Sequence, residues 1–233
     1  MHAQRVEYRD PTLINRILKW LLWLLLVSIS LLFASHLFEL VFEYSGYQQE
    51  QLREMGVPYF PRTAELTGSY LIVMVSCSVA MLSWIYRCNY NLHQLGAKGL
   101  RFSPFQSIAW YFVPVAFFWK PYQAMVELCR HIHTLEGKTK PVPTFLLRLW
   151  WISFVTHFLA HLLNPLHSLP NALHSPEAAC LLVTDMLSIT LLSTTLLLVG
   201  HINQSLDQIA HRHVGAFASL ACKYPPSKEG GFE

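Results

Sequence analysis

The stretch "FSPFQSIAWYFVPVAFFWKPYQAM", residues 102–125, decides how the chain is arranged in a membrane. Its apolar part, residues 105–119, would reach only about 22 Å as a helix, which is too short to cross a hydrocarbon core of roughly 30 Å. Pro114 stands in the middle of this part, removes a backbone donor and would kink a helix. We therefore predict a re-entrant or interfacial element over residues 105–119, which dips into the membrane and returns to the same side.

The rest of the chain has the composition of an integral membrane protein. Hydrophobic residues make up 53% of the sequence and charged residues 13%, about half of the roughly 25% that is typical of a soluble domain. A membrane-spanning helix needs ~20 predominantly apolar residues. Four runs meet this requirement, at about residues 20–42, 68–86, 145–163 and 178–199. The sequence predicts an all-α, polytopic membrane protein with four transmembrane helices, the first of them an uncleaved signal anchor.

The distribution of Lys and Arg predicts the topology. If residues 105–119 do not cross the membrane, fifteen of the 17 Lys and Arg residues lie on the side of the N-terminus, whereas only seven lie there if these residues cross. Lys and Arg are enriched in cytoplasmic loops, so the first arrangement is favoured. We expect a single transmembrane domain over residues 20–205, with cytoplasmic tails at residues 1–19 and 206–233.

A second helical pattern follows the re-entrant element directly. From Pro121 onward, apolar side chains recur at helical spacing, while Glu127 and Arg130 take the opposite face. Gly137 ends the pattern. We predict an amphipathic cytoplasmic surface helix over residues 121–135, with its apolar side in the lipid headgroups or against the bundle.

The segment from Tyr86 to Leu128 reads "YRCNYNLHQLGAKGLRFSPFQSIAWYFVPVAFFWKPYQAMVEL". It resembles the signature of DUF4328, an uncharacterised bacterial membrane family, in which "RFSP" followed by "WKPYQAM" is the specific part. The resemblance implies a four-span fold and a location in the bacterial cytoplasmic (inner) membrane. It implies no activity, because the family has none assigned.

Five ionisable side chains are predicted to lie in the outer halves of the spans, namely His36, Glu39, His157, His161 and Asp185. His36 and Glu39 are three residues apart, so they share one helix face. His157 and His161 are four residues apart and share a face of another helix. Ionisable groups inside a membrane are expensive and suggest function by default. One hypothesis is a transition metal or haem bound by His157 and His161, with a carboxylate from another helix. A proton or ion path and structural polar contacts are the alternatives.

The cytoplasmic face offers a second candidate site. Its predicted partner- or lipid-binding residues are basic or aromatic: Arg101, Trp110, Trp119, Lys120 and Tyr122. Basic residues near a membrane attract anionic headgroups at ~1 kcal/mol each. Topology signalling alone is the alternative explanation for these basic residues.

Three classes of function remain open. The favoured one is a non-catalytic membrane module that binds membrane lipids, a protein partner or a second copy of the chain through its cytoplasmic face. The others are a small transporter, channel or proton-relay protein that uses Asp185 and the histidines, and a membrane-embedded metal or haem enzyme. The sequence has no phosphate-binding glycine loop and indicates no cofactor apart from that metal or haem. Topology explains the net charge of +3, so we expect no nucleic-acid partner.

Overall fold

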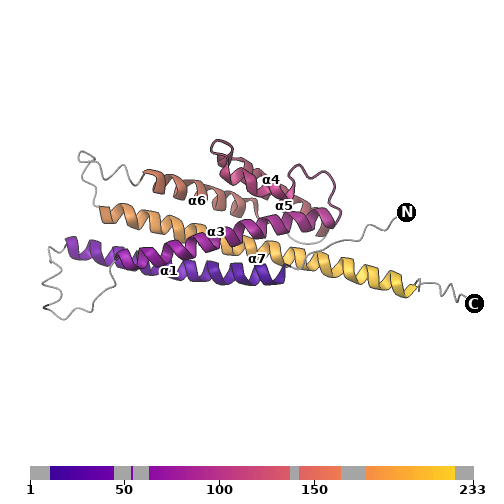
Figure 1. Cartoon of the computed structure of the whole chain (residues 1–233), viewed down its shortest axis with the longest axis horizontal. Coiled ribbons are helices and arrows are strands. Elements are labelled where there is room, and N and C mark those ends of the chain that lie inside the picture. The colour runs from indigo at the N-terminus through magenta and orange to yellow at the C-terminus, as the bar shows by residue number, and fades with distance from the viewer. Residues whose placement is uncertain (1–10, 45–53, 55–62, 137–141, 164–176, 224–233) are drawn as a thin grey trace, which may run out of the picture.

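The computed structural model describes residues 11–44, 54, 63–136, 142–163 and 177–223. Within these residues the chain forms helices and turns and contains no strand. Figure 1 shows the long helices lying side by side. In chain order the elements are α1 (Thr12–Tyr44), α3 (Thr63–Gln94), α4 (Pro104–Ala109), the 3₁₀ turns η1 (Trp110–Phe112) and η2 (Ala116–Phe118), α5 (Lys120–Glu136), α6 (Thr144–Leu163) and α7 (Glu177–Lys223).

Four of the described helices are long and apolar enough to cross a membrane, which confirms the four predicted spans. The qualifying segments are Thr12–Phe38, Gly68–Gln94, Thr144–Leu162 and Cys180–Ile209. The first helix begins inside the segment predicted as a tail, because the Asn15 N–H donates to the Pro11 carbonyl at 2.8 Å and closes a helical turn there. Of the predicted tails at residues 1–19 and 206–233, residues 1–10 and 224–233 lie outside the described residues.

The helix α1 packs against both α3 and α7, and α6 packs against α7 (Figure 1). We call the end of the bundle where α1 begins the inner end, and the opposite end the outer end. The chain runs outward in α1 and α6 and inward in α3 and α7. The outer ends of α1 and α6 thus lie beside the beginnings of α3 and α7.

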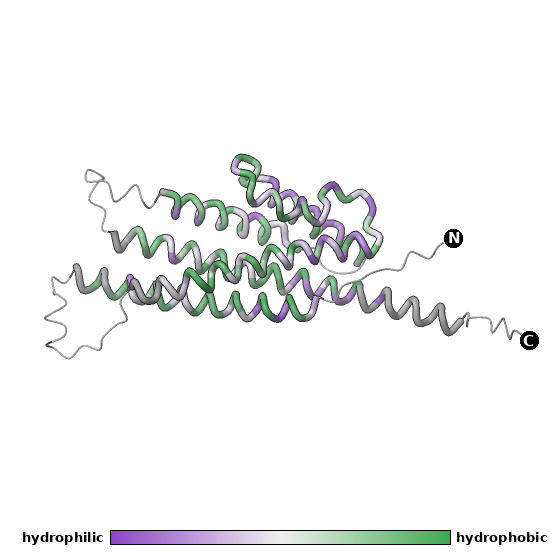
Figure 2. The backbone as a smooth tube through the Cα atoms, viewed as in Figure 1, coloured by the Kyte–Doolittle hydropathy of each residue, from purple (hydrophilic) through white to green (hydrophobic). Residues whose placement is uncertain are grey.

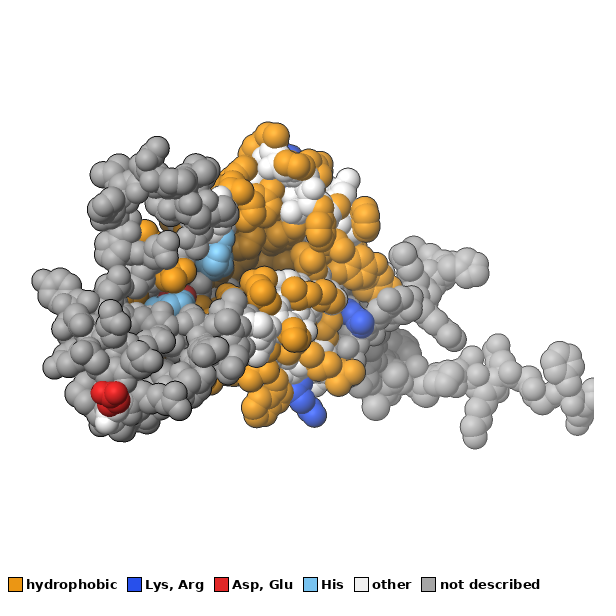
Figure 3. All heavy atoms as spheres, turned by 60° about the vertical axis from the view of Figure 1, so that its left-hand side comes forward, with side chains coloured by type: hydrophobic (Ala, Val, Ile, Leu, Met, Phe, Trp, Pro, Cys, Tyr) orange, Lys and Arg blue, Asp and Glu red, His pale blue; other side chains and the backbone are white. Residues whose placement is uncertain are grey.

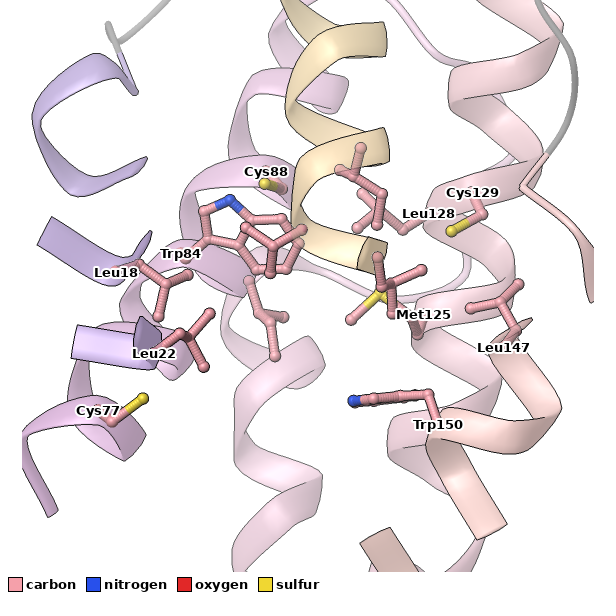
Figure 4. Packing of buried hydrophobic residues seen from close by; sticks show 14 of the residues in the cluster. Leu18, Leu22, Cys77, Trp84, Cys88, Met125, Leu128, Cys129, Leu147 and Trp150 are labelled. Atoms are coloured by element: carbon pink, nitrogen blue, oxygen red, sulfur yellow. The ribbon is translucent and has the colours of Figure 1, made fainter. Parts of the chain in front are cut away.

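The hydrophobic core is concentrated in the inner half of the bundle. Trp84 of α3 is 0% exposed, and its Nε1–H donates to Oδ1 of Asn203 in α7 at 2.8 Å. Figure 4 shows Leu18 and Leu22 of α1 and Met125 of α5 in the same cluster as Trp84. Because lipid is as apolar as these side chains, close packing and the interhelical hydrogen bond, rather than exclusion from water, hold the helices together.

The outward faces of the bundle are apolar as well. Figure 2 shows hydrophobic residues along the spans, with hydrophilic ones gathered toward the inner ends of α3 and α5. Trp20 of α1, Ile72 of α3, Phe145 of α6 and Met186 of α7 are among the exposed hydrophobic side chains. A monomer in water rarely exposes apolar surface on this scale. The composition of both core and surface is that of a membrane protein.

Residues 102–119 fold into a hairpin of short pieces instead of one helix. Ser103 Oγ accepts the Gln106 N–H at 3.2 Å, and the Gln106 side chain accepts the Ser103 N–H at 3.1 Å. This capping box starts α4. After η1 the chain turns through Pro114, and η2 leads back so that α5 lies beside α4. The segment is therefore broken, as Pro114 predicted, and its re-entrant position in a membrane stays a prediction.

The helix α5 exceeds its predicted range by one residue at each end. Its buried side chains include Met125, Leu128, Cys129 and Ile132, and the helix contacts α3 and α7. Of the two environments predicted for its apolar face, the structure therefore shows the one against the bundle. Burial also raises the pKa of Cys129 to about 12, so this thiol stays protonated at neutral pH.

Trp84 tests how far the inner core stabilises the fold. Trp84→Ala should lower the free energy of unfolding by about 3–5 kcal/mol, because it opens a cavity and removes the bond to Asn203. Trp20→Ala is the matched control, because Trp20 is 72% exposed, and it should cost less than about 0.5 kcal/mol. Unfolding by titration with a denaturing detergent in mixed micelles measures both. Equal losses would contradict the placement of the core.

Candidate functional site

The hairpin and the first turn of α5, residues 102–122, form a unit that we call the aromatic block. It is seated on α6: the ring centroid of Phe117 lies 5.4 Å from that of Phe154 and 4.8 Å from that of Phe158. The Trp151 Nε1–H also donates to the Phe118 carbonyl at 3.3 Å. Phe158 lies about 21 Å from the Thr144 end of α6 at ~1.5 Å per residue. Phe154 lies about 15 Å from the same end, so Phe117 contacts the candidate span between its middle and its outer end.

The tip of the aromatic block exposes apolar side chains. Phe112 is 72% exposed and Val115 is 70% exposed, and Phe105, Val113 and Trp119 are exposed as well. These side chains do not take part in the ring contacts between Phe117 and α6. They form an apolar surface on the block that the described residues leave uncovered.

Lys120 stands where the block joins α5, with its ammonium among aromatic rings. Its Nζ lies 5.7 Å from the ring centroid of Phe102 and 5.5 Å from that of Trp110, within the ~6 Å at which a cation is attracted to a ring face. Tyr122 packs on Trp151 with ring centroids 6.0 Å apart. The structure thus brings Lys120 and Trp110 together and places Tyr122 against α6.

Glu127 of α5 anchors the beginning of the aromatic block. Its carboxylate oxygen Oε1 accepts the backbone N–H of Arg101 at 2.7 Å and that of Phe102 at 3.1 Å. Hydrogen bonds to an ionised acceptor are among the strongest in proteins. The side chain of Arg101 is exposed, so the backbone is held while the guanidinium stays accessible.

At the outer half of the bundle, two of the predicted intramembrane residues meet. Nδ1 of His36 in α1 and Oδ2 of Asp185 in α7 lie 2.6 Å apart, and both side chains are buried. The imidazole donates and the carboxylate accepts. A carboxylate in this position is stabilised by its histidine partner instead of being left alone in hydrocarbon.

The other two predicted histidines form a separate pair on α6. His157 Nδ1 lies 3.1 Å from Ser188 Oγ of α7, and the rings of His157 and His161 meet edge to face with centroids 4.5 Å apart. His161 is exposed, whereas His157 is partly buried. The hydrogen bond to Ser188 joins this pair to the helix that carries Asp185.

The described residues contain no group of three or more His, Cys, Asp or Glu side chains that could hold one metal ion. Four of the five predicted ligands form two pairs, His36 with Asp185 and His157 with His161. The side chain of the fifth, Glu39, lies outside the described residues. The observed geometry is that of a hydrogen-bonded polar cluster.

Sequence reasoning missed Tyr70, Ser188 and Glu127. The Tyr70 hydroxyl is hydrogen-bonded to Ser188, but no sequence signal marks such a bond. Most hydroxyls in the spans bond to their own helix instead, as Ser76 does to the Ile72 carbonyl at 2.9 Å. Glu127 could have been found, because it is the acidic residue on the polar face of the predicted surface helix.

Glu127→Ala tests the anchor of the aromatic block. The backbone N–H groups of Arg101 and Phe102 would lose their acceptor, so local protection from hydrogen exchange should fall by about 1–3 kcal/mol. Gln123→Ala changes an exposed residue of the same helix and should leave both amides as protected as before. Hydrogen–deuterium exchange over residues 98–105 distinguishes the two. The assignment fails if Glu127→Ala exchanges there like the control.

Comparison with known proteins identifies a family. No curated protein and no solved structure matches the chain. Residues 63–204, from the beginning of α3 into the inner part of α7, match the family described as "Domain of unknown function (DUF4328)". The matched region contains the whole aromatic block and every described member of the polar cluster except His36. The resemblance seen in the sequence is confirmed, and the chain belongs to the DUF4328 family.

Proposed function

We propose that this protein is a non-catalytic membrane module that binds an anionic phospholipid of the cytoplasmic leaflet through its aromatic block. The observation that carries the proposal is the seating of Phe117 against Phe154 and Phe158, well inside a candidate span. A block held at that depth presents its exposed side chains to hydrocarbon. The same block carries a cation, Lys120, on its return.

The apolar tip suits the acyl part of a lipid. Broken backbone at membrane depth is tolerated where protein covers it, and α6 covers the block on the Phe117 side. The exposed side of the tip, with Phe112 and Val115, is left to acyl chains, and each Å² of apolar surface that they cover contributes about 25 cal/mol. This supports a re-entrant position for residues 105–119.

Lys120 and Arg101 suit the headgroup. Trp151 lies about 10 Å from the Thr144 end of α6. It binds the carbonyl of Phe118, and Lys120 comes two residues after Phe118 in the chain. A lysine at this depth extends its ammonium toward the interface. Arg101 is exposed, and its backbone N–H is bound by Glu127, which lies further along α5 than Lys120. Each cation contributes ~1 kcal/mol to the attraction of an anionic headgroup.

The orientation that we propose follows from charge. With four spans and a block that returns, fifteen of the 17 Lys and Arg residues fall on the side of the inner end. The positive-inside bias makes that side cytoplasmic. Both termini then lie in the cytoplasm, and the family resemblance favours the bacterial inner membrane.

Lys120→Gln tests the lipid site, and Arg130→Gln is its matched control. Both variants remove one positive charge from α5, but Arg130 lies on the exposed side of that helix. Lys120→Gln should weaken binding of phosphatidylglycerol about fivefold, the equivalent of ~1 kcal/mol. Arg130→Gln should bind it like the unchanged protein. Native mass spectrometry with a defined mixture of phosphatidylglycerol and phosphatidylcholine measures the retained lipid.

Two further outcomes matter. Phe112→Asn should lower retention of both lipids alike, because it alters the acyl contact and leaves the charge unchanged. If Lys120→Gln and Arg130→Gln retain the same amount of phosphatidylglycerol, the lipid proposal is wrong. A protein partner or a second copy of the chain would then be the next occupant to examine for the aromatic block.

A further inference from the structure

All four spans contribute to one cluster of polar side chains in the outer half of the bundle, which we call the outer polar cluster. Its members are His36 of α1, Tyr70 of α3, His157 of α6, and Asp185 and Ser188 of α7. Tyr70, His36, Asp185 and Ser188 are buried. Ionisable side chains inside a membrane are rare and suggest an ion or proton path by default.

The cluster has two parts that meet at Tyr70. In one part, His36 and Asp185 are joined at 2.6 Å. In the other, Ser188 donates its hydroxyl proton to the Thr184 carbonyl at 2.8 Å and accepts hydrogen bonds from His157, at 3.1 Å, and from the Tyr70 hydroxyl. Tyr70 also lies close enough to Asp185 to feel the charge of its carboxylate. Hydroxyl groups both donate and accept hydrogen bonds, so Tyr70 and Ser188 can pass a proton between the two parts.

The cluster reaches the surface toward the outer end. His161 is exposed and touches His157 ring to ring at 4.5 Å. Figure 3 turns the outer end toward the viewer and shows histidine side chains at the surface beside hydrophobic ones. Imidazole is the side chain whose ordinary titration lies nearest to neutral pH. His161 is therefore suited to exchange protons with the medium.

Toward the inner end the cluster is closed by apolar packing. Leu22 of α1 and Val199 of α7 each lie about 21 Å along their helices from the His36–Asp185 pair at ~1.5 Å per residue. Both are buried in the hydrophobic core with Trp84. None of these three side chains titrates, although the thiols of Cys77 and Cys88 lie in the same core. A proton that enters from the outer end meets a barrier there.

We propose that the outer polar cluster is a proton-binding site that exchanges protons with the outer side of the membrane only. A proton from water binds the His161 imidazole and passes to His157. His157 gives its Nδ1 proton to Ser188, whose hydroxyl turns from the Thr184 carbonyl toward Tyr70 and releases its own proton. Tyr70 accepts that proton and releases its own to the His36–Asp185 pair. The relay groups return to their starting state, so the net change is one proton gained by the pair.

Charge explains why the pair takes up a proton. A neutral imidazole beside an ionised carboxylate carries a net charge of −1, whereas an imidazolium beside the same carboxylate carries none, and hydrocarbon disfavours the uncompensated charge. The titratable groups around the pair are Tyr70 and Cys77 of α3 and His157 and His161 of α6. Glu39 follows on α1, with its side chain outside the described residues. Because no Lys or Arg is among these groups within the described residues, we assign the neutralising charge to a proton.

Proton uptake by the purified protein tests the site. In weakly buffered solution, the protein should take up protons after a jump to lower pH, and Asp185→Asn should take up about one proton per chain fewer. The reason is that the buried His36 imidazole then has no carboxylate to balance its positive charge and stays neutral. His161→Gln should slow the uptake by the pair roughly a hundredfold, the scale on which a positioned acid–base group acts. His133→Gln is the control, because it removes another exposed histidine, from α5. In oriented proteoliposomes, only a pH jump at the outer end should load the site.

Each result decides the proposal in one direction. Loss of one proton in Asp185→Asn, slow uptake in His161→Gln and uptake from the outer end support it. Full uptake in Asp185→Asn, a His161→Gln rate equal to that of His133→Gln, or loading from the inner end would overturn it and leave the cluster as a structural contact. If Asp185→Asn does not fold, the rate in His161→Gln and the side of loading decide.

Discussion

Hydrocarbon supplies no hydrogen-bond partners, and this constraint governs every part of the chain. Helices satisfy their own backbone, so the spans are helical. Hydroxyl side chains follow the same rule: Ser28 donates to the Leu24 carbonyl at 2.8 Å, and Thr190 donates to the Met186 carbonyl at 2.8 Å. Such side chains can face lipid without an unpaired polar group. The polar groups that do reach across to another helix, such as Ser188 toward His157, are therefore the informative ones.

The constraint is met differently in the two halves of the bundle. In the inner half, Trp84, Leu18 and Leu22 pack into a core, with the bond from Trp84 to Asn203 as its cross-helix polar link. In the outer half, the bonds from His36 to Asp185 and from His157 to Ser188 join α1 and α6 to α7. The inner half therefore holds the helices together by shape, and the outer half by polar pairs. The proton site that we propose lies in the outer half for the same reason.

The aromatic block shows what broken backbone needs in such surroundings. Pro114 prevents a continuous helix, and the capping box at Ser103 starts α4 within the segment. The contacts of Phe117 with Phe154 and Phe158 then fix the block against a span. Glu127, which accepts from the Arg101 and Phe102 N–H groups, fixes its beginning. The proposed lipid site depends on both anchors, because they place Lys120 and the exposed tip on one rigid unit.

By itself the sequence determined the all-helical class, the four spans and the broken segment at Pro114. The length and the apolar content of a span can be read from one run of residues. A proline likewise breaks the helix in which it stands, whatever lies around it. Only the tertiary structure decided which polar side chains meet. His36 and Asp185 are 149 positions apart, and their pairing depends on the rotation and register of α1 against α7. That rotation depends on the packing around Trp84. Hydropathy does not predict it, because nearly every face of these helices is apolar.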